Sequence, residues 1–410
     1  MSSSFLTCAR AQEPDQRLRA LSTPATPSLV KRIFGLLLLL LAMQITARAW
    51  EVIMHEGRRH VPIEDVSKFY RLREPLVNGP AFSMSGTSKT IRGRAGTREI
   101  YINNVKYILC FPVEQKGGRL LISAMDVTKI IEPVMRPGLI KNAHAVRTVI
   151  LDAGHGGHDS GAKGQRGIEK EAALDVVLRA KRLLEQNGYT VRLTRSSDVF
   201  IPLEDRAAFA NRFTNAIFVS VHFNKSGGGG ASGIETFALA PRGVPSMDEE
   251  NFSYSDLKLH PGHGQDAENI ALATALHSSM LRHMRLTDRG IKRARFVVIR
   301  DIRIPGVLLE GGFMNHPVDG KLIASPAYRD AFARAILEGV GRYRSAVSGE
   351  TSYQAPSAVA SATDKTSVPD LRRNISPLGM HPMLNEAVQR AADSLKTSDS
   401  AAQQTKPDAN

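Results

Sequence analysis

Short apolar runs alternate with longer amphipathic stretches between residues 147 and 345. The runs span three to six residues, which suits a strand, and the stretches between them repeat apolar residues at helical spacing. Glu169–Asn187, for example, carries Leu174, Val177, Leu178 and Leu184 at helical spacing. The predicted strands are Thr148–Leu151, Thr190–Leu193, Ile217–Val221, Ile234–Leu239, Phe296–Ile299 and Val307–Leu309, and the predicted helices are Glu169–Asn187, Asp266–Leu286 and Tyr328–Arg344.

This alternation predicts an α/β fold over residues 147–345. When a helix connects two consecutive strands, the strands run parallel and helices cover the sheet. We therefore expect a mainly parallel, twisted sheet flanked by helices.

The region from residue 50 to 141 has a different pattern. Ile100–Leu109 holds two β-branched and aromatic runs around Asn103–Asn104, which predicts a hairpin, and Gly117–Gly118 predicts a second turn. Met135–Gly138 interrupts the pattern with a Pro-Gly pair. A small β-rich domain is thus expected before the α/β domain.

The two ends of the chain carry different signals. Lys31–Arg32, the apolar run Leu36–Leu41 and the small residues of Ala47–Ala49 are typical of a secretory signal over residues 1–49, with a long leading region. An uncleaved membrane anchor is the alternative, although the apolar stretch is short for a span. Residues 346–410 are rich in Ser, Ala, Thr and Pro, which predicts a disordered tail.

Composition limits the partners. The formal charge is +14 and falls to +10 without residues 1–49, which carry six Lys or Arg and two acidic residues. Excess positive charge on an exported protein favours an anionic envelope polymer and makes nucleic acid an unexpected partner. Removing the signal would also leave Cys110 as the only cysteine, so no disulfide within the chain is expected.

Four residues at the ends of these elements are candidates for chemistry. His155 follows the first predicted strand between two glycines, and Glu169 opens a helix. His222 closes an apolar run before a glycine-rich loop, and Glu310 closes the run Gly306–Leu309. The carboxyl ends of strands are where α/β sheets place their sites. Two imidazoles and one carboxylate form a typical catalytic zinc set, and a further carboxylate can move the proton of a water.

Spacing alone leaves some of these choices open. His158 and Glu171 are near competitors of His155 and Glu169. The glycines around His155 do not form a nucleotide loop, because Asp159 and Ala162 stand where such loops need Gly and Lys.

Five segments in order over about 200 residues resemble the zinc-dependent N-acetylmuramoyl-L-alanine amidases of the amidase-3 family. They are Ile150–Gly157, Gly167–Lys170 with Leu174, Thr194–Arg195 with Leu203–Arg206 and Ala210–Asn211, Ser220–Asn224, and Leu308–Asn315.

The resemblance implies a role for each site residue. His155, Glu169 and His222 would bind Zn²⁺, and Glu310 would be the catalytic carboxylate. Asn224 and Arg206, in the same segments, would contact substrate. The implied reaction cleaves the amide between N-acetylmuramic acid and L-alanine in peptidoglycan, in the periplasm or the cell wall. A silent wall-binding protein and a zinc peptidase acting within the stem peptide are the alternatives.

Two further expectations concern the rest of the chain. Residues 50–141 resemble the small domain named after the amino-terminal region of copper amine oxidases, on Ile102–Tyr107, Leu121–Val127 and Ile131–Pro133. This implies a wall-binding or spacer role. Pro241–Gln265 lacks helical periodicity, so we expect no long helix there of the kind that plugs the zinc site of regulated relatives.

Overall fold

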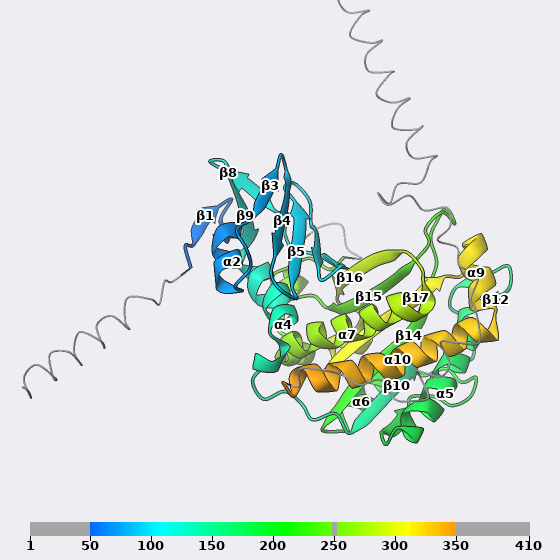
Figure 1. Cartoon of the computed structure of the whole chain (residues 1–410). Coiled ribbons are helices and arrows are strands. Elements are labelled where there is room, and N and C mark those ends of the chain that lie inside the picture. The colour runs from blue at the N-terminus through cyan, green and yellow to red at the C-terminus, as the bar shows by residue number, and fades with distance from the viewer. Residues whose placement is uncertain (1–49, 248–251, 350–410) are drawn as a thin grey trace, which may run out of the picture. The chain divides into compact units, whose positions relative to one another are not determined.

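The computed structural model describes residues 50–247 and 252–349 (Figure 1). The predicted signal lies outside these residues, and so does the predicted tail from residue 350 onward. The last helix, α10, continues to Val347, two residues beyond the expected end of the α/β domain. No helix in the described part of the chain has the length and apolar content to cross a membrane.

The first part of the described chain is rich in strands, as predicted. Asn103 and Asn104 form the turn of a hairpin with φ values of 51° and 65°, in the left-handed region that Asn tolerates. Gly117–Gly118 forms a second hairpin turn. The elements are β1 (Ile53–His55), β2 (Arg58–Pro62), α2 (Ile63–Phe69), β3 (Leu76–Asn78), β4 (Ala81–Ser85), β5 (Thr90–Arg94), β6 (Glu99–Ile102), β7 (Val105–Ile108), β8 (Glu114–Lys116), β9 (Arg119–Ser123), α3 (Ala124–Asp126), a π-helical turn (Val127–Ile131), α4 (Glu132–Met135) and a 3₁₀ turn (Pro137–Leu139).

The second part alternates strands and helices, which confirms the α/β prediction. Its elements are β10 (Thr148–Ala153), β11 (Lys163–Gly164), β12 (Gly167–Ile168), α5 (Glu169–Gln186), β13 (Thr190–Leu193), α6 (Leu203–Ala210), β14 (Ala216–Asn224), β15 (Ile234–Leu239), 3₁₀ turns (Tyr254–Leu257 and Pro261–Gln265), α7 (Asp266–Met284), β16 (Asp288–Ala294), α8 (Val297–Arg300), β17 (Gly306–Phe313), α9 (Pro317–Ile323) and α10 (Pro326–Val347).

One sheet of eleven strands runs through both parts, in the order β13-β10-β14-β17-β15-β16-β7-β6-β5-β4-β3. Strands β13, β10, β14 and β17 are parallel, and β15 is antiparallel to β17. The strand-rich part joins the sheet where β7 pairs with β16 through Tyr107 and Ile291. A smaller sheet has the order β1-β2-β9-β8. The two predicted regions thus share a sheet instead of forming detached units.

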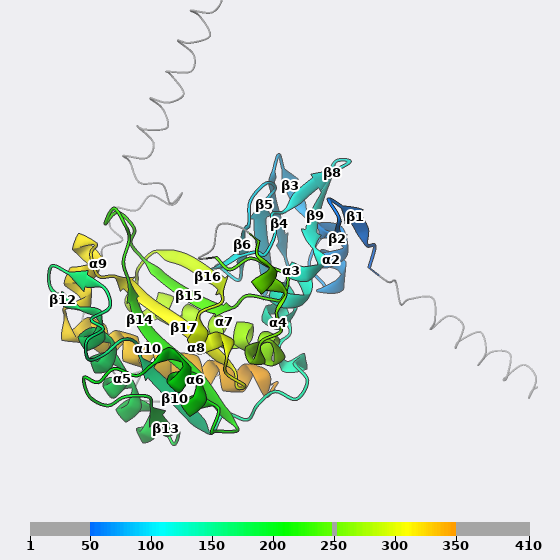
Figure 2. The same ribbon diagram turned by 180° about the vertical axis from the view of Figure 1, so that it is seen from behind.

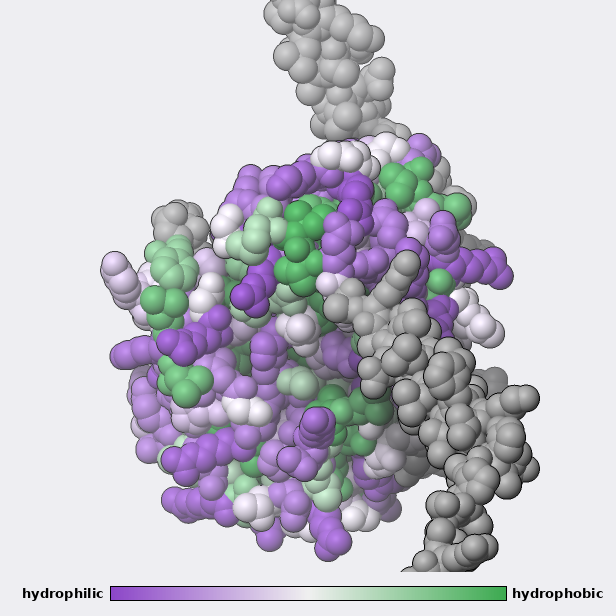
Figure 3. All heavy atoms as spheres, turned by 90° about the vertical axis from the view of Figure 1, so that its left-hand side faces the viewer, coloured by the Kyte–Doolittle hydropathy of each residue, from purple (hydrophilic) through white to green (hydrophobic). Residues whose placement is uncertain are grey.

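Helices cover both faces of the α/β part of the sheet. The long helices α5, α7 and α10 pack on one face, which is nearest the viewer in Figure 1. The short helices α6 and α8 pack on the other face, seen in Figure 2. Beneath them Phe218, Ile299 and Leu308 belong to a buried apolar cluster. The face seen in Figure 3 is mainly hydrophilic, with hydrophobic side chains in small separate patches.

One strand prediction is wrong. Phe296–Ile299 is not a strand, because the chain turns at Phe296 into the single helical turn α8. The strand at this point of the sheet is β16, whose sequence Asp-Arg-Gly-Ile-Lys-Arg-Ala looks like a polar loop. Its charged side chains lie inside the protein because each has a partner: Lys292 contacts Glu235, and Arg293 contacts Asp266. A four-residue apolar run has no periodicity that separates a helix from a strand.

Candidate functional site

The candidate residues meet at the carboxyl ends of three neighbouring strands. His155 follows β10, His222 lies near the end of β14, and Glu310 lies on β17 directly opposite His222 in the strand register. Glu169 is the first residue of α5, whose backbone N–H groups point toward the same edge. The parallel arrangement therefore places residues that are far apart in sequence on one edge of the sheet.

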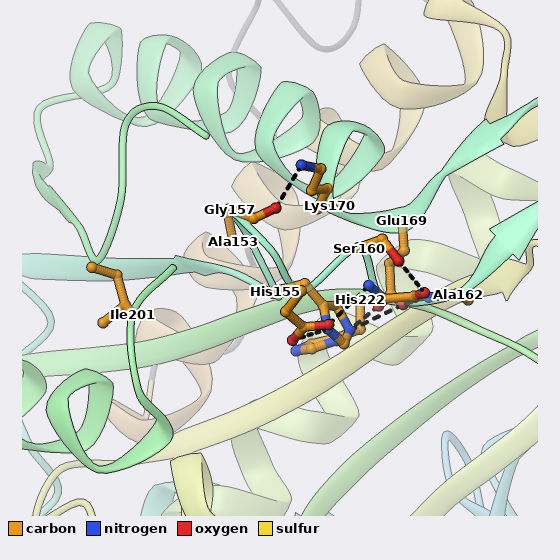
Figure 4. Close-up of polar contacts among 12 residues, drawn as sticks. Ala153, His155, Gly157, Ser160, Ala162, Glu169, Lys170, Ile201 and His222 are labelled. Carbon is orange, nitrogen blue, oxygen red and sulfur yellow. Dashed lines mark hydrogen bonds and ion pairs between the residues drawn. The ribbon is translucent and has the colours of Figure 1, made fainter. Parts of the chain in front are cut away.

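His155, Glu169 and His222 converge on one point. Glu169 Oε2 lies 3.0 Å from His155 Nε2, and Glu169 Oε1 lies 2.8 Å from His222 Nδ1. The two rings lie edge to face, with centroids 5.0 Å apart. Figure 4 shows the His155 and His222 side chains next to each other. One donor atom from each residue lies within 4.8 Å of the other two, so the three could hold one metal ion.

The electrostatics of Glu169 suit such a role. Burial alone would raise its pKa, but the hydrogen bonds and charges of His155 and His222 outweigh burial and lower the pKa far below its ordinary value. Glu169 is therefore ionised at neutral pH and available as an anionic ligand. It also accepts hydrogen bonds from the backbone N–H groups of Ala162 and Phe223, which fix both of its oxygens.

Two glycines make room for the rings. A Cβ at Gly154 would lie 2.3 Å from the His222 ring, and a Cβ at Gly161 would lie 2.5 Å from Glu169 Oε2. Neither contact is sterically allowed. His155 itself has a φ of 60°, a conformation in which a non-glycine residue is strained. Positions 154 and 161 therefore require glycine, because the side chains of the site leave no room for a Cβ atom there.

Glu310 occupies the floor of the same site without a partner of its own. In the described part of the chain its Oε2 atom is buried and makes no hydrogen bond. Burial and the nearby charges of Glu169 and Glu235 raise the pKa of Glu310 well above its ordinary value, and Lys292 offsets only part of this effect. An isolated carboxyl group with a raised pKa is a typical general acid or base.

A cavity of about 590 Å³ opens onto these residues. The polar part of its lining includes His155, His222 and Glu310, together with Asp152, Asp159, Arg206 and Arg295. The apolar part consists of Phe200, Ile201, Leu203, Phe296, Val297, Val298 and Leu308. The site can therefore receive a group that has both polar and apolar parts, such as a substituted amide.

The competing residues lie outside the convergence. The His158 ring packs on Phe200, with centroids 4.2 Å apart, and Glu171 is exposed on the first turn of α5. Neither contributes a donor atom to the group formed by His155, Glu169 and His222.

Arg206 and Asn224, expected to contact substrate, are engaged within the protein. Arg206 lines the cavity, but it donates to Asp152 Oδ1 and to the carbonyls of Ala153, His155 and Ile201. Asn224 donates to Glu235 Oε2 and accepts from the Lys225 N–H. Substrate contact by either residue stays a prediction.

Sequence reasoning missed the residues that hold the loop after β10. Arg195 is buried and donates to the carbonyls of Ala153, Gly154 and Lys170. Asp152 is buried and accepts from Thr194, Arg206 and Ser220. Such buried charges need partners, so an Asp within an apolar strand was the available signal.

The segment from Pro241 to Gln265 holds no long helix in its described residues. It contains only two 3₁₀ turns, and Arg295 fixes it by donating to Asp256 and to the carbonyls of Pro241 and Val244. Residues 248–251 lie outside the description. The cavity lining contains no described residue of this segment.

A helix-flanked mixed sheet that brings three possible metal donors and a further carboxylate together at its strand ends fits the class of α/β hydrolases whose residues could hold a metal ion. Comparison with known proteins narrows the class. The family described as N-acetylmuramoyl-L-alanine amidase matches residues 149–342. N-acetylmuramoyl-L-alanine amidase AmiA of Escherichia coli K12 is 32% identical over 225 residues, which are 50% of this chain and 78% of AmiA. The chain therefore belongs to the N-acetylmuramoyl-L-alanine amidase family.

Other similar proteins carry the same description. N-acetylmuramoyl-L-alanine amidase AmiC of Neisseria meningitidis serogroup B is 30% identical over 229 residues, or 51% of this chain and 55% of that protein. The solved structure of AmiC2 of Nostoc punctiforme is 32% identical, with a TM-score of 0.39 over 47% of this chain and 94% of that one. The family match begins in β10 and ends in α10, so it does not extend to the strand-rich part.

Proposed function

We propose that this protein is a zinc-dependent amidase that cleaves the bond between N-acetylmuramic acid and L-alanine in peptidoglycan. The observation that carries the proposal is the convergence of His155, Glu169 and His222 beside Glu310, whose Oε2 has no partner in the described chain. The family and the names of its members supply the substrate.

The residues fit zinc. Two imidazole nitrogens and one carboxylate are the donor set of catalytic zinc sites that keep a position open. One donor atom from each residue lies within 4.8 Å of the other two, so the three side chains could close around one Zn²⁺ ion. Zinc bound by such a set polarises a carbonyl oxygen and lowers the pKa of a water.

The protein's own groups would do the remaining work. Glu310 would take a proton from the attacking water and deliver it to the leaving amine, because a carboxyl group with a raised pKa can both accept and donate a proton. The apolar walls formed by Phe200 and Phe296 would exclude other water molecules from the amide. Arg206 would hold the His155 carbonyl in place throughout.

The rest of the chain suits a role in the envelope. Residues 1–49 carry the predicted secretory signal, which supports export to the periplasm or the cell wall. Residues 50–141 would serve as a wall-binding module, and their excess of basic residues supports an anionic polymer as partner. The resemblance to the copper amine oxidase amino-terminal region stays a prediction.

Product analysis tests this function. Purified peptidoglycan is digested with the full chain, with and without a chelator, and the products are identified by mass spectrometry. We expect whole stem peptides with a free L-alanine amine and peptide-free glycan, loss of both with chelator, and recovery on adding Zn²⁺. Fragments cut within the stem peptide would show a peptidase, and unchanged peptidoglycan bound by the protein would show a binding protein.

A further inference from the structure

Both nitrogens of the His155 ring face a carboxylate. Nε2 lies 3.0 Å from Glu169 Oε2, and Nδ1 lies 2.8 Å from Oδ2 of Asp159, four residues along the loop. Glu169 belongs to the proposed ligand set, but Asp159 does not. Asp159 also lines the cavity.

The chemistry of the Asp159 contact decides where the ring carries a proton. An ionised carboxylate accepts hydrogen bonds and cannot donate them. Asp159 is half-buried and its other oxygen accepts the Gly161 N–H, so it meets the His155 ring as an acceptor. His155 Nδ1 must therefore be the donor. When such a ring is neutral, a proton on Nδ1 leaves the lone pair on Nε2, the atom that faces Glu169.

The orientation of Asp159 is itself fixed. Its Oδ1 accepts from the Gly161 N–H at 3.0 Å, which leaves Oδ2 for His155. Its backbone forms a pair of hydrogen bonds with Gly156, at 2.9 and 3.1 Å. Arg206 holds the His155 carbonyl from the other side. The ring and its acceptor are thus parts of one tight loop.

We propose that Asp159 is the positioning residue for His155: it holds the proton on Nδ1 and so presents the lone pair of Nε2 to the metal. The metal part rests on the proposed function, whereas the choice of tautomer does not. Without Asp159, Glu169 would be the stronger remaining acceptor and would draw the proton to Nε2, where it blocks metal binding. A carboxylate behind a ligand histidine typically changes metal affinity about 10- to 100-fold.

Asp198 provides a matched control. It is another acidic residue at the rim, and it accepts from the Gly157 N–H and from Lys170 without touching a proposed ligand. His222 provides an internal control, because its Nδ1 faces Glu169 and not Asp159. Among the described residues, the Asp159 carboxylate hydrogen-bonds with the His155 ring and the Gly161 N–H.

The experiment compares full-length wild type with Asp159→Ala, Asp159→Asn and Asp198→Asn. Ring ¹⁵N NMR of the metal-free proteins, at a pH where the rings are neutral, reports the tautomer of His155, assigned through His155→Gln. Competition with a chromophoric chelator reports the affinity for Zn²⁺. Circular dichroism and thermal unfolding verify that each variant is folded.

We expect Asp159→Ala to convert His155 from mainly Nδ1–H to mainly Nε2–H and to weaken Zn²⁺ binding about 10- to 100-fold, with His222 unchanged. Asp159→Asn keeps a neutral acceptor, so its Zn²⁺ affinity and its fraction of Nδ1–H tautomer should lie between those of wild type and Asp159→Ala. Asp198→Asn should match wild type in both. An unchanged tautomer in folded Asp159→Ala, or affinity within about threefold of wild type, would overturn the inference. If wild type bound no Zn²⁺ while the tautomer still shifted, the proposed function would fail and the positioning role would stand.

Discussion

Two carboxylates on adjacent strands, the buried one of Glu235 and the half-buried one of Glu310, lie directly opposite each other and have different surroundings. Glu235 on β15 and Glu310 on β17 are register partners. Glu235 accepts from Asn224, and from Arg289 and Lys292 at 2.6 and 2.7 Å. Glu310 Oε2 has no partner among the described residues, and the pKa of Glu310 is raised. Full pairing makes a buried carboxylate part of the structure, and isolation leaves it available for proton transfer.

Replacing Glu235 or Glu310 by Gln should therefore have opposite effects: loss of stability at Glu235 and loss of activity at Glu310. Near Glu235 the protein gains stability from charge pairing between β15 and β16. Near Glu310 it tolerates an unfavourable environment, which is common where a group must react.

Removing the Glu310 carboxylate should have the largest effect. We expect Glu310→Gln to lower the rate of stem-peptide release about 10³-fold, because proton transfer to and from the reacting groups is lost. The free energy of unfolding should stay within about 1 kcal/mol of wild type or rise, since Gln replaces an unpaired ionisable group. The measurements are release of free L-alanine amines and urea denaturation, with Zn²⁺ content as control. Activity within tenfold of wild type would contradict a role in proton transfer.

The same substitution at Glu235 should mainly affect stability. Glu235→Gln leaves Arg289 and Lys292 without a charged partner, so we expect the free energy of unfolding to fall by about 2 kcal/mol. Activity should fall less than about tenfold. Urea denaturation measures the stability loss, and Glu99→Gln is the control, because Glu99 is half-exposed and pairs with Lys106 near the surface. If Glu235→Gln abolished activity with no loss of stability, the contrast between the two carboxylates would be wrong.

Glu338 on α10 tests whether pairing has the same consequence outside the sheet. It accepts from His283, Arg282 and Arg342. Burial alone would raise its pKa, but these partners lower it to about 2. Because the folded-state pKa lies below the unfolded value, the stabilisation is present above about pH 4.5 and is lost as pH falls toward 2.

Glu338→Gln should therefore lower the free energy of unfolding by about 2 kcal/mol at pH 7, and the difference from wild type should disappear near pH 2. Urea denaturation at several pH values between 2 and 7 measures this. A difference that is independent of pH would show that packing, and not charge, stabilises this position.

Much of the fold and of the candidate site could be predicted from the sequence, because both follow from where apolar runs begin and end. Strand ends in an α/β sheet carry the reactive groups, so polar residues that close apolar runs stand out, as His222 and Glu310 did. Glycines mark close approach of backbone to side chains, which located His155. The alternation of short apolar runs with amphipathic stretches predicted a sheet covered by helices.

The residues that escaped prediction depend on contacts between distant segments. Strand β16 looked like a loop because its charges are neutralised by Glu235 and Asp266, which lie elsewhere in the chain. Asp159 is next to His158 in the sequence, but the turn after β10 directs its carboxylate to His155. Pairing of this kind follows from the tertiary fold and leaves no periodic signal.

Lys292 lies between the two carboxylates and allows the smallest and most specific test. It pairs with Glu235, and its charge is the one that lowers the pKa of Glu310. Lys292→Met removes that charge while Arg289 still pairs with Glu235, so the pKa of Glu310 should rise further. A base with a higher pKa is ionised only at higher pH, so the acid limb of the activity profile should move upward by at most about one pH unit. The profile of kcat/KM against pH measures the shift, with Lys106→Met as the control, because Lys106 is a similarly half-buried lysine that pairs with a different glutamate, Glu99. A shift to lower pH, or none, would show that Glu310 does not respond to the charges around Glu235.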